Sequence, residues 1–519
     1  MKIFAILILL WSHFQSIVCR YMFPIIHMFK PPPLPPITNS LLKQSASTLA
    51  KKVRNQELSS QTLVQACIDR IEEVNPFLNA IVEDRFEEAL AEAKKCDAML
   101  KSGEVNAVTL EKEKPLFGVP VTIKESLSLN GMSCAGGNLA NEGRKAPKNS
   151  SIVDMVLNAG AIPLCVTNTS ELCCSIHSSN VLTGVTKNPY DTRLSPGGSS
   201  GGEGALLASG GSVLGFGSDL LGSIRVPSLF NGVFGHKPSP GIISNEGHFP
   251  YSTDPTFMKM LVVGPMAKHA TDLRFAMKIL TPNLSQTLRL DEPINLKTIR
   301  VFYLEQFDSI CGINDTTQDI KDKIKDAVRH LKGIGVHVEE LPQDYVKNMY
   351  LQFMATFGDI KFPTVVETPK GDMAAPSVVE YHKGWFGLSK YSAQLSLTRM
   401  VVEANGFMSS QDVQEVLAER EILRKKLDTL LDERTAIIMP TYAQPTTYPA
   451  EIVLQTDCAV YCAFCNFMYC PATHVPMGLN EDDLPVGFQV VAACNQDRIC
   501  LTIAEELERA FGGWVPPPS

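Results

Sequence analysis

Residues that could do chemistry are concentrated in a glycine- and serine-rich stretch at 195–241. Apolar residues such as Leu206 and Phe216 are interleaved with the glycines, whereas a flexible linker would lack them. A folded segment is therefore expected, in which glycine permits tight turns and close approach of the backbone. A nucleophile needs such turns, because their backbone N–H groups can stabilise an oxyanion. The hydroxyls placed in these turns are those of Ser199, Ser200 and Ser223.

A serine that cleaves an amide also needs a base to remove its proton. The chain has 10 histidines, and only His236 falls in a motif of this region. A Ser-His-Asp triad is therefore disfavoured, and a lysine base is the alternative. Such a lysine must be neutral, so burial has to lower its pKa from about 10.4. Lys124 follows the apolar run 119–123, which makes its burial plausible.

Several segments of the chain resemble the motifs of the amidase signature family. They are GVPVTIKE at 118–125, GGSSGG at 197–202, GSDLLGSIRVP at 217–227 and GHKPS at 235–239. Long motifs in the right order are far more specific than a lone glycine-rich loop. The resemblance extends from about Leu41 to the end of the chain. It implies an α/β fold with a large mixed, twisted β-sheet flanked by helices.

The roles of individual residues are implied by the same resemblance. Ser223 matches the nucleophile, Ser199 a bridging serine with an unusual cis peptide, and Lys124 the base. Lys124 would take a proton from Ser199, which takes one from Ser223, and the proton would return to the leaving nitrogen. The backbone N–H groups expected to form the oxyanion hole belong to Leu220, Leu221, Gly222 and Ser223. The residues expected to support the site are Ser200, Asp219 and Arg225.

One position departs from the family pattern, because Leu221 stands where the family has glycine. A leucine keeps the N–H but excludes backbone angles that only glycine adopts readily. If the position needs positive φ, the loop shifts, activity suffers and Leu221→Gly raises the rate. Otherwise Leu221 is tolerated, reshapes the pocket and packs against the acyl group. The sequence alone favours the first alternative.

Composition limits the partners of the protein. Its 47 basic and 55 acidic residues give a net charge of −8, which disfavours nucleic acid as a partner. No metal or organic cofactor is implied. Cys458, Cys462 and Cys465 have a spacing used for iron–sulfur clusters, but an apolar helix explains them better. The remaining cysteine spacings suggest no disulfide framework, and most cysteines are expected to be buried.

The chain divides into three predicted parts. Residues 1–30 read as a signal peptide or an imperfect membrane anchor, with the anchor slightly favoured by the family resemblance. Residues 31–40 form a proline-rich spacer. Residues 41–519 form a single domain. Either reading of the first part places the protein in the secretory pathway or on its membranes.

Hydrophobic periodicity predicts the elements that position these residues. Helices are expected at 63–74, where Asn75-Pro76 ends the helix, and at 86–100, 152–158, 203–208, 317–331 and 411–431. Strands are expected at 119–123, 162–166, 299–304, 336–341 and 436–440. Strands that alternate with helices indicate parallel pairing and an α/β core.

These observations predict a serine hydrolase that cleaves apolar acyl amides at or near a membrane. The resemblance points to primary fatty-acid amides and N-acyl ethanolamines as small-molecule substrates. One alternative is an amidase or esterase for smaller acyl groups, and another is an impaired relative that only binds lipid amides. A homodimer is left open.

Overall fold

The computed structural model describes all residues except 1–13, 15–16, 19–20, 23–30, 308–314 and 364–376. Its centre is a sheet of 11 strands in the order β1-β3-β2-β6-β8-β7-β12-β13-β11-β9-β10. The strands of this sheet and of the separate β4–β5 pair are β1 (Ile81–Asp84), β2 (Pro120–Lys124), β3 (Ile162–Thr167), β4 (Ser179–Asn180), β5 (Gly184–Val185), β6 (Leu214–Asp219), β7 (Phe234–Lys237), β8 (Val262–Ala267), β9 (Arg300–Tyr303), β10 (His337–Glu340), β11 (Thr435–Pro440), β12 (Ala472–Leu479) and β13 (Pro485–Ala492).

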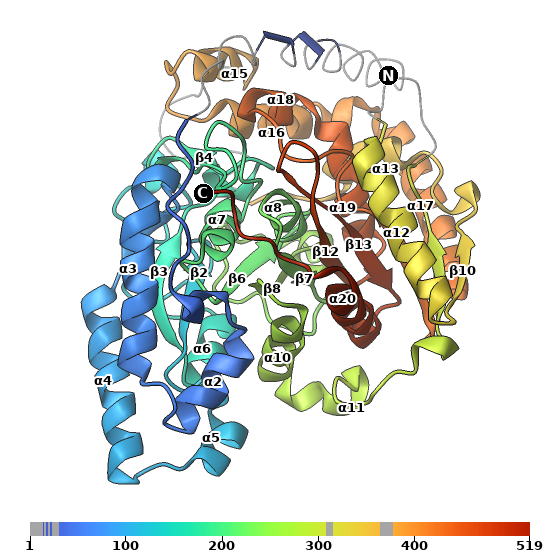
Figure 1. Ribbon diagram of the computed structural model, residues 1–519. Helices are drawn as coiled ribbons and strands as arrows, with labels where there is room; N and C mark the ends of the chain where they lie inside the picture. The colour runs from blue at the N-terminus through green and yellow to red at the C-terminus, as the bar shows by residue number, and fades with distance from the viewer. Residues whose placement is uncertain (1–13, 15–16, 19–20, 23–30, 308–314, 364–376) are drawn as a thin grey trace.

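Helices flank this sheet on its faces and ends (Figure 1). They are α2 (Ala46–Arg54), α3 (Ser60–Leu78), α4 (Phe86–Ser102), α5 (Ala107–Glu113), α6 (Ser151–Asn158), α7 (Gly201–Ser209), α8 (Arg225–Phe230), α9 (Pro255–Met260), α10 (Ala270–Leu280), α11 (Ser285–Leu288), α12 (Gln318–Gly333), α13 (Met349–Asp359), α15 (Ser377–Trp385), α16 (Ala393–Glu403), α17 (Ser410–Leu430), α18 (Pro449–Leu454), α19 (Val460–Phe467) and α20 (Asp497–Phe511). Short 3-10 turns include η3 (Glu171–Cys173) and η8 (Thr456–Ala459). The predicted fold class is confirmed.

The sheet is mixed. Strand β2 pairs in parallel with β3 and β6, and β9 pairs in parallel with β10 and β11. The pairs β6–β8, β7–β8, β7–β12, β12–β13 and β11–β13 are antiparallel. Because β2 and β6 run in the same direction, their carboxyl ends meet at one edge of the sheet. Open α/β sheets bind ligands at such an edge.

The proline inside α3 corrects one predicted boundary. The helix begins as expected, with the Ser59 side chain accepting a hydrogen bond from the Thr62 N–H. It continues through Pro76 to Leu78 and ends at Asn79, which is left-handed with φ 50°. A proline in the last turn removes only one backbone hydrogen bond, so the helix ends later than Asn75-Pro76 predicted.

The proline-rich segment before the first helices packs against the body of the protein. Leu34 and Ile37 are buried. Arg70 of α3 donates hydrogen bonds to the carbonyl groups of Pro35 and Pro36. Most of residues 1–30, on which the anchor prediction rests, lie outside the described residues. No helix in the described part of the chain is long and apolar enough to cross a membrane.

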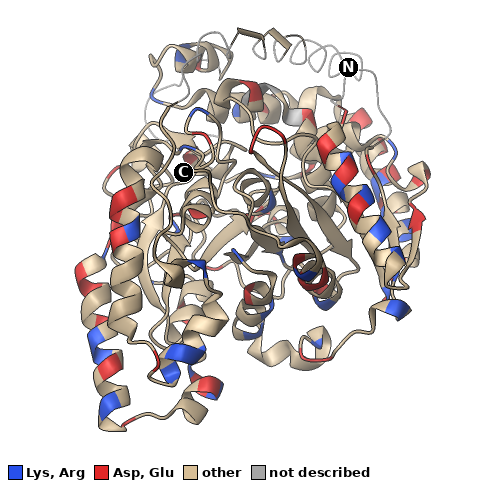
Figure 2. Ribbon diagram, in the orientation of Figure 1, with Lys and Arg blue, Asp and Glu red and all other residues tan. Residues whose placement is uncertain are grey.

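Charged residues of both signs are interspersed along the outer helices, as α4 and α12 show (Figure 2). The central sheet is largely uncharged in the same view. The few buried charges near the sheet therefore need specific partners, because an unpaired charge is costly to bury. Those partners define the candidate site.

Candidate active site

Lys124 occupies the last position of β2 and is fully buried, with 0% of its surface exposed. Its Nζ lies 2.6 Å from Ser199 Oγ and 3.0 Å from Ser218 Oγ. Burial is the largest influence on this amine and lowers its pKa, although Cys173, Asp219 and Glu203 act in the opposite direction. A lysine with a lowered pKa beside a serine hydroxyl is suited to accept a proton.

Ser199 lies in the turn that leads into α7, and its peptide bond with Gly198 is cis. This is the peptide geometry that the family resemblance implied. A side chain at Gly198 would meet the backbone of Ile176 and His177 at 2.7–2.8 Å, so only glycine fits. The next residue, Ser200, is buried and donates its N–H to the carbonyl of Ser223 at 3.2 Å. The two serine-bearing turns are thereby fastened to each other.

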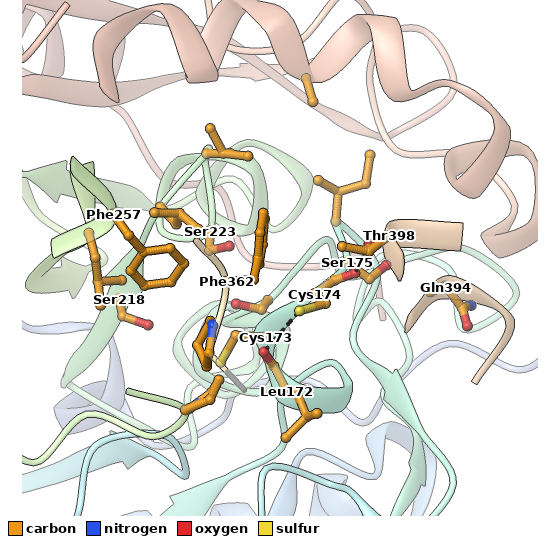
Figure 3. Close-up of a pocket in the computed structure, with 18 of the residues that line it drawn as sticks. Leu172, Cys173, Cys174, Ser175, Ser218, Ser223, Phe257, Phe362, Gln394 and Thr398 are labelled. Atoms are coloured by element: carbon orange, nitrogen blue, oxygen red, sulfur yellow. Dashed lines mark hydrogen bonds between the residues drawn. The ribbon is translucent and has the colours of Figure 1, made fainter. Parts of the chain in front are cut away.

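Ser223 is half-buried and faces the pocket. Its hydroxyl makes no hydrogen bond to the residues that the structure describes. Ser199, Ser218 and Ser223 line the same pocket, and Figure 3 shows the Ser218 and Ser223 hydroxyls at its edge. The structure thus brings the three predicted catalytic residues close together. No hydrogen bond joins the hydroxyl groups of Ser199 and Ser223.

The loop before Ser223 is held by a buried ion pair. Asp219 and Arg225 have no exposed surface, and Arg225 Nη2 lies 2.9 Å from Asp219 Oδ1. The Asp219 carboxylate accepts hydrogen bonds from the N–H groups of Gly222 and Ile224, at 2.8 and 3.1 Å. Burial would raise the pKa of Asp219, but the Arg225 guanidinium outweighs it and holds that pKa well below its usual range.

The hydrogen bonds accepted by Asp219 change the predicted oxyanion hole. The Gly222 N–H already donates to Asp219, so it is not free to bind an oxyanion as predicted. The N–H groups of Leu220, Leu221 and Ser223 make no hydrogen bond within the described part of the chain. These three remain the available donors of the predicted four.

The backbone at Leu221 decides between the alternatives left open by the sequence. Among the described residues, Leu221 is not one of those with positive φ, whereas Gly222 has φ +118°. A Cβ at Gly222 would also meet the Cβ of Cys462 at 2.6 Å. Glycine is therefore required at 222 and not at 221. Leu221 therefore does not occupy a glycine-only backbone angle, and its side chain lines the pocket. The effect of Leu221 on the rate stays a prediction.

The pocket encloses about 990 Å³ of empty space, counting its open mouth. Its apolar wall is formed by aromatic and aliphatic side chains: Leu220, Leu221, Phe257, Leu261, Phe353, Phe357, Phe362 and Leu397. Phe257 and Phe362 lie near Ser223 in Figure 3, whereas Gln394 and Thr398 lie at the far side.

Sequence reasoning missed several polar residues of the site. Ser218 stands inside the recognised motif and could have been found there. His248 and Cys173 line the pocket but carry no sequence signal. Glu203 of α7 accepts hydrogen bonds from Thr122 on β2 and Thr167 on β3, at 2.6 and 2.9 Å. Burial raises the pKa of Glu203 to about 8.

The cysteines with iron–sulfur spacing serve packing instead. Cys458, Cys462 and Cys465 are buried on η8 and α19. The Cys462 thiol donates to the carbonyl of Thr441 at 3.0 Å. Cys465 contacts the side-chain oxygen of Gln489 at 3.6 Å. As predicted, most cysteines in the described residues are buried.

Comparison with known proteins agrees with this geometry. A model of the Amidase family matches residues 62–501, and the chain belongs to this family of amide-cleaving hydrolases. Fatty-acid amide hydrolase 2-A of Danio rerio is 39% identical over 495 residues, covering 93% of this chain and 92% of that protein. Fatty-acid amide hydrolase 2 of Homo sapiens is 37% identical over 491 residues, covering 93% and 92%.

Solved structures show the same fold at lower sequence identity. A bacterial aryl acylamidase of the amidase signature family superposes with a TM-score of 0.72 at 22% identity, covering 91% of this chain and 97% of that one. A structure described as fatty acid amide hydrolase gives a TM-score of 0.71 at 22% identity, covering 93% and 87%. Phrases such as GHKPSPG at 235–241 and FGGWV at 511–515 resemble fatty-acid amide hydrolase 2.

Proposed function

We propose that this amidase hydrolyses apolar, fatty-acid amides through an acyl-enzyme formed on Ser223. The observation that carries the proposal is the buried Lys124 amine, which lies 2.6 Å from Ser199 Oγ. Ser199 in turn lines a pocket with an apolar wall. The names of the most similar relatives given above support the fatty-acid amide as substrate.

The first half-reaction transfers the acyl group to the enzyme. Ser223 Oγ attacks the carbonyl carbon while its proton passes to Ser199, and the Ser199 proton passes to neutral Lys124. The oxyanion is stabilised by the N–H groups of Leu220, Leu221 and Ser223. The C–N bond then breaks as Lys124 returns the proton through Ser199 to the leaving nitrogen.

The second half-reaction releases the fatty acid. A water molecule gives its proton to the same relay and attacks the Ser223 ester. The ester C–O bond breaks, and the relay returns the proton to Ser223. The apolar wall would hold the acyl chain in both halves, which favours long-chain over short-chain amides because more apolar area is buried.

Labelling with a fluorophosphonate probe, together with hydrolysis of a long-chain primary amide, tests this proposal. Wild-type protein should label and hydrolyse the amide, whereas Ser223→Ala should do neither. Hydrolysis of a short-chain amide or ester in preference to the long-chain amide would identify the smaller-substrate alternative. Labelling of Ser223→Ala at the wild-type rate would refute the assigned nucleophile.

We also propose that residues 1–30 attach the protein to a membrane. The apolar run near the start of the chain supports this proposal. The proline-rich segment that follows is held to α3 by a hydrogen bond from Arg70 to the carbonyl of Pro35, so a membrane-bound N-terminus would be tethered to the folded domain. Deletion of residues 1–30, with residues 31–40 kept, should release the protein from vesicles in a flotation assay without loss of amidase activity. A mature N-terminus near Arg20 in native material would instead identify a cleaved signal peptide.

A further inference from the structure

Lys124 has a second hydroxyl neighbour that the proton relay does not use. Ser218 Oγ lies 3.0 Å from Lys124 Nζ and 2.9 Å from Nε2 of His248. His248 is buried, with 5% of its surface exposed, and lines the pocket. A chain of three polar groups therefore extends from the base to an imidazole that sequence analysis did not single out.

The direction of the hydrogen bonds in this chain is fixed at its far end. Nδ1 of His248 lies 2.9 Å from the carbonyl oxygen of Pro250. A carbonyl only accepts hydrogen bonds, so Nδ1 carries a proton. In the neutral imidazole, Nε2 is then the acceptor. Ser218 must donate its hydroxyl proton to Nε2, and its oxygen is left to accept an N–H from Lys124.

This direction matters for the base. A neutral lysine amine has two N–H groups and one lone pair. If one N–H is donated to Ser218, the lone pair is free to face Ser199. If Nε2 could not accept, the Ser218 hydroxyl would turn to the Lys124 lone pair and compete with Ser199 for it.

We propose that His248 is a positioning residue, which acts through Ser218 to keep the lone pair of Lys124 directed at Ser199. The inference rests on the proposed function, in which Lys124 is the base. His248 needs no contact with the reacting atoms of the substrate for this role.

Protonation of His248 would reverse the arrangement. An imidazolium donates from both nitrogens, so Nε2 would donate to Ser218, and the Ser218 hydroxyl would turn to Lys124.

Ionisable groups near His248 are Lys124 on β2 and Cys173 on η3. Glu125 follows Lys124 and accepts hydrogen bonds from Ser133, Ala135 and Gly136. Arg144 lies over the ring of the neighbouring Phe249, at 4.0 Å. The positioning role therefore requires the neutral imidazole with its proton on Nδ1.

The test compares His248→Leu and His248→Gln with His337→Gln, a control at an exposed histidine. Steady-state kinetics with one long-chain primary amide are measured from about pH 5.5 to 10, alongside fluorophosphonate labelling. His248→Leu should lower kcat about tenfold and leave KM within about twofold, because the base is misdirected while the pocket is intact. His248→Gln should recover most of kcat, since its amide oxygen can accept a hydrogen bond from Ser218.

A second comparison shows whether His248→Leu lowers kcat through Ser218. Each variant must have the same unfolding midpoint as the wild type. His248→Leu should have no further effect on kcat in a Ser218→Ala background, because the two residues act as one unit. Wild-type kcat in His248→Leu would overturn this inference and leave the proposed function standing. A wild-type protein that neither labels nor hydrolyses the amide would instead overturn the proposed function, and the inference with it.

Discussion

The Arg225 guanidinium donates to both oxygens of the Asp219 carboxylate, at 3.0 and 2.9 Å, and neither side chain has exposed surface. The same guanidinium also binds the side chains of Gln489 and Asn466 and the carbonyl of Cys462. Three distant parts of the chain thus meet behind the loop that carries Ser223. The position of Ser223, the proposed nucleophile, therefore depends on a charge pair that does not line the pocket.

Removing the charge of Asp219 should destabilise the fold. Asp219→Asn leaves the Arg225 charge buried without its partner, which typically costs about 3–5 kcal/mol of unfolding free energy. Because the pKa of Asp219 is lowered on folding, its contribution is present above the unfolded pKa of about 3.9 and is lost as pH falls. Urea unfolding at neutral pH should show the loss, and the gap to wild type should narrow in acid.

The matched control is Asp344→Asn, which removes an exposed partner of Lys426. Its effect should stay within about 0.5 kcal/mol, as for other surface pairs. Equal stability of Asp219→Asn and wild type at neutral pH would show that the buried pair is not needed.

Gly222→Ala should damage the site through the backbone. Its positive φ disfavours any side chain, and the new Cβ would approach Cys462 within 2.6 Å. A shift of about 1 Å in the loop can cost about 10²-fold in rate. We expect kcat to fall by about that factor, measured with a long-chain amide.

The control for this prediction is Gly103→Ala, where φ is +74° but no atom lies within 4 Å of the added Cβ. That variant should keep the wild-type kcat, because the strain lies away from the pocket. Normal turnover by Gly222→Ala would mean that the loop tolerates displacement.

Leu221→Gly should weaken substrate binding rather than raise the rate. The half-buried side chain lines the pocket, and its loss removes apolar contact worth about 1 kcal/mol, or roughly fivefold in KM. The added chain entropy should also lower stability by about 0.5–1 kcal/mol. Kinetics with a long-chain and a short-chain amide would check this, since only the long chain should lose affinity. A higher kcat in Leu221→Gly would instead support the alternative in which Leu221 shifts the loop before Ser223 and lowers activity.

Lys124 should impose a pH dependence on catalysis. Burial lowers its pKa, so the active neutral amine persists to a lower pH than for an exposed lysine and is lost as pH falls through that lowered pKa. Lys124→Arg should be inactive at every pH measured, because arginine cannot be deprotonated in proteins. The rate of fluorophosphonate labelling across pH gives the readout. A labelling rate that Lys124→Arg leaves unchanged would exclude the lysine as base.

Much of this site could be predicted because most of its residues lie in short, contiguous sequence motifs. The predicted strands 119–123 and 162–166 correspond to β2 and β3, and the predicted helix 411–431 to α17. Strand β6 was not predicted, because its glycines give no alternation of apolar and polar residues. The assignment of 41–519 to one domain stays a prediction.

The contact between Ser218 and His248 could not be predicted, since it is created by the sheet and not by any spacing in the chain. The hydrogen bond joins residues 30 positions apart, and the bond from Ser218 to Lys124 spans 94. The role of Leu221 was likewise hidden, because residue type alone does not reveal φ. The first became visible only once the loop that carries His248 was placed beside β6, and the second only once the backbone angles were known.

The proposed reactive groups and half of the apolar wall come from different stretches of chain. Lys124, Ser199 and Ser223 lie on β2 and on the loops beside β6, whereas α13, α16 and Phe362 supply half of the wall. Segments of a protein can open separately below the threshold of global unfolding. Opening of α13 and α16 would leave the serine reactive while its selectivity for acyl chains disappears. Mild heat or denaturant would then reduce the selectivity of the enzyme for long acyl chains before it reduces activity. Loss of chain-length selectivity would be the first sign of partial unfolding.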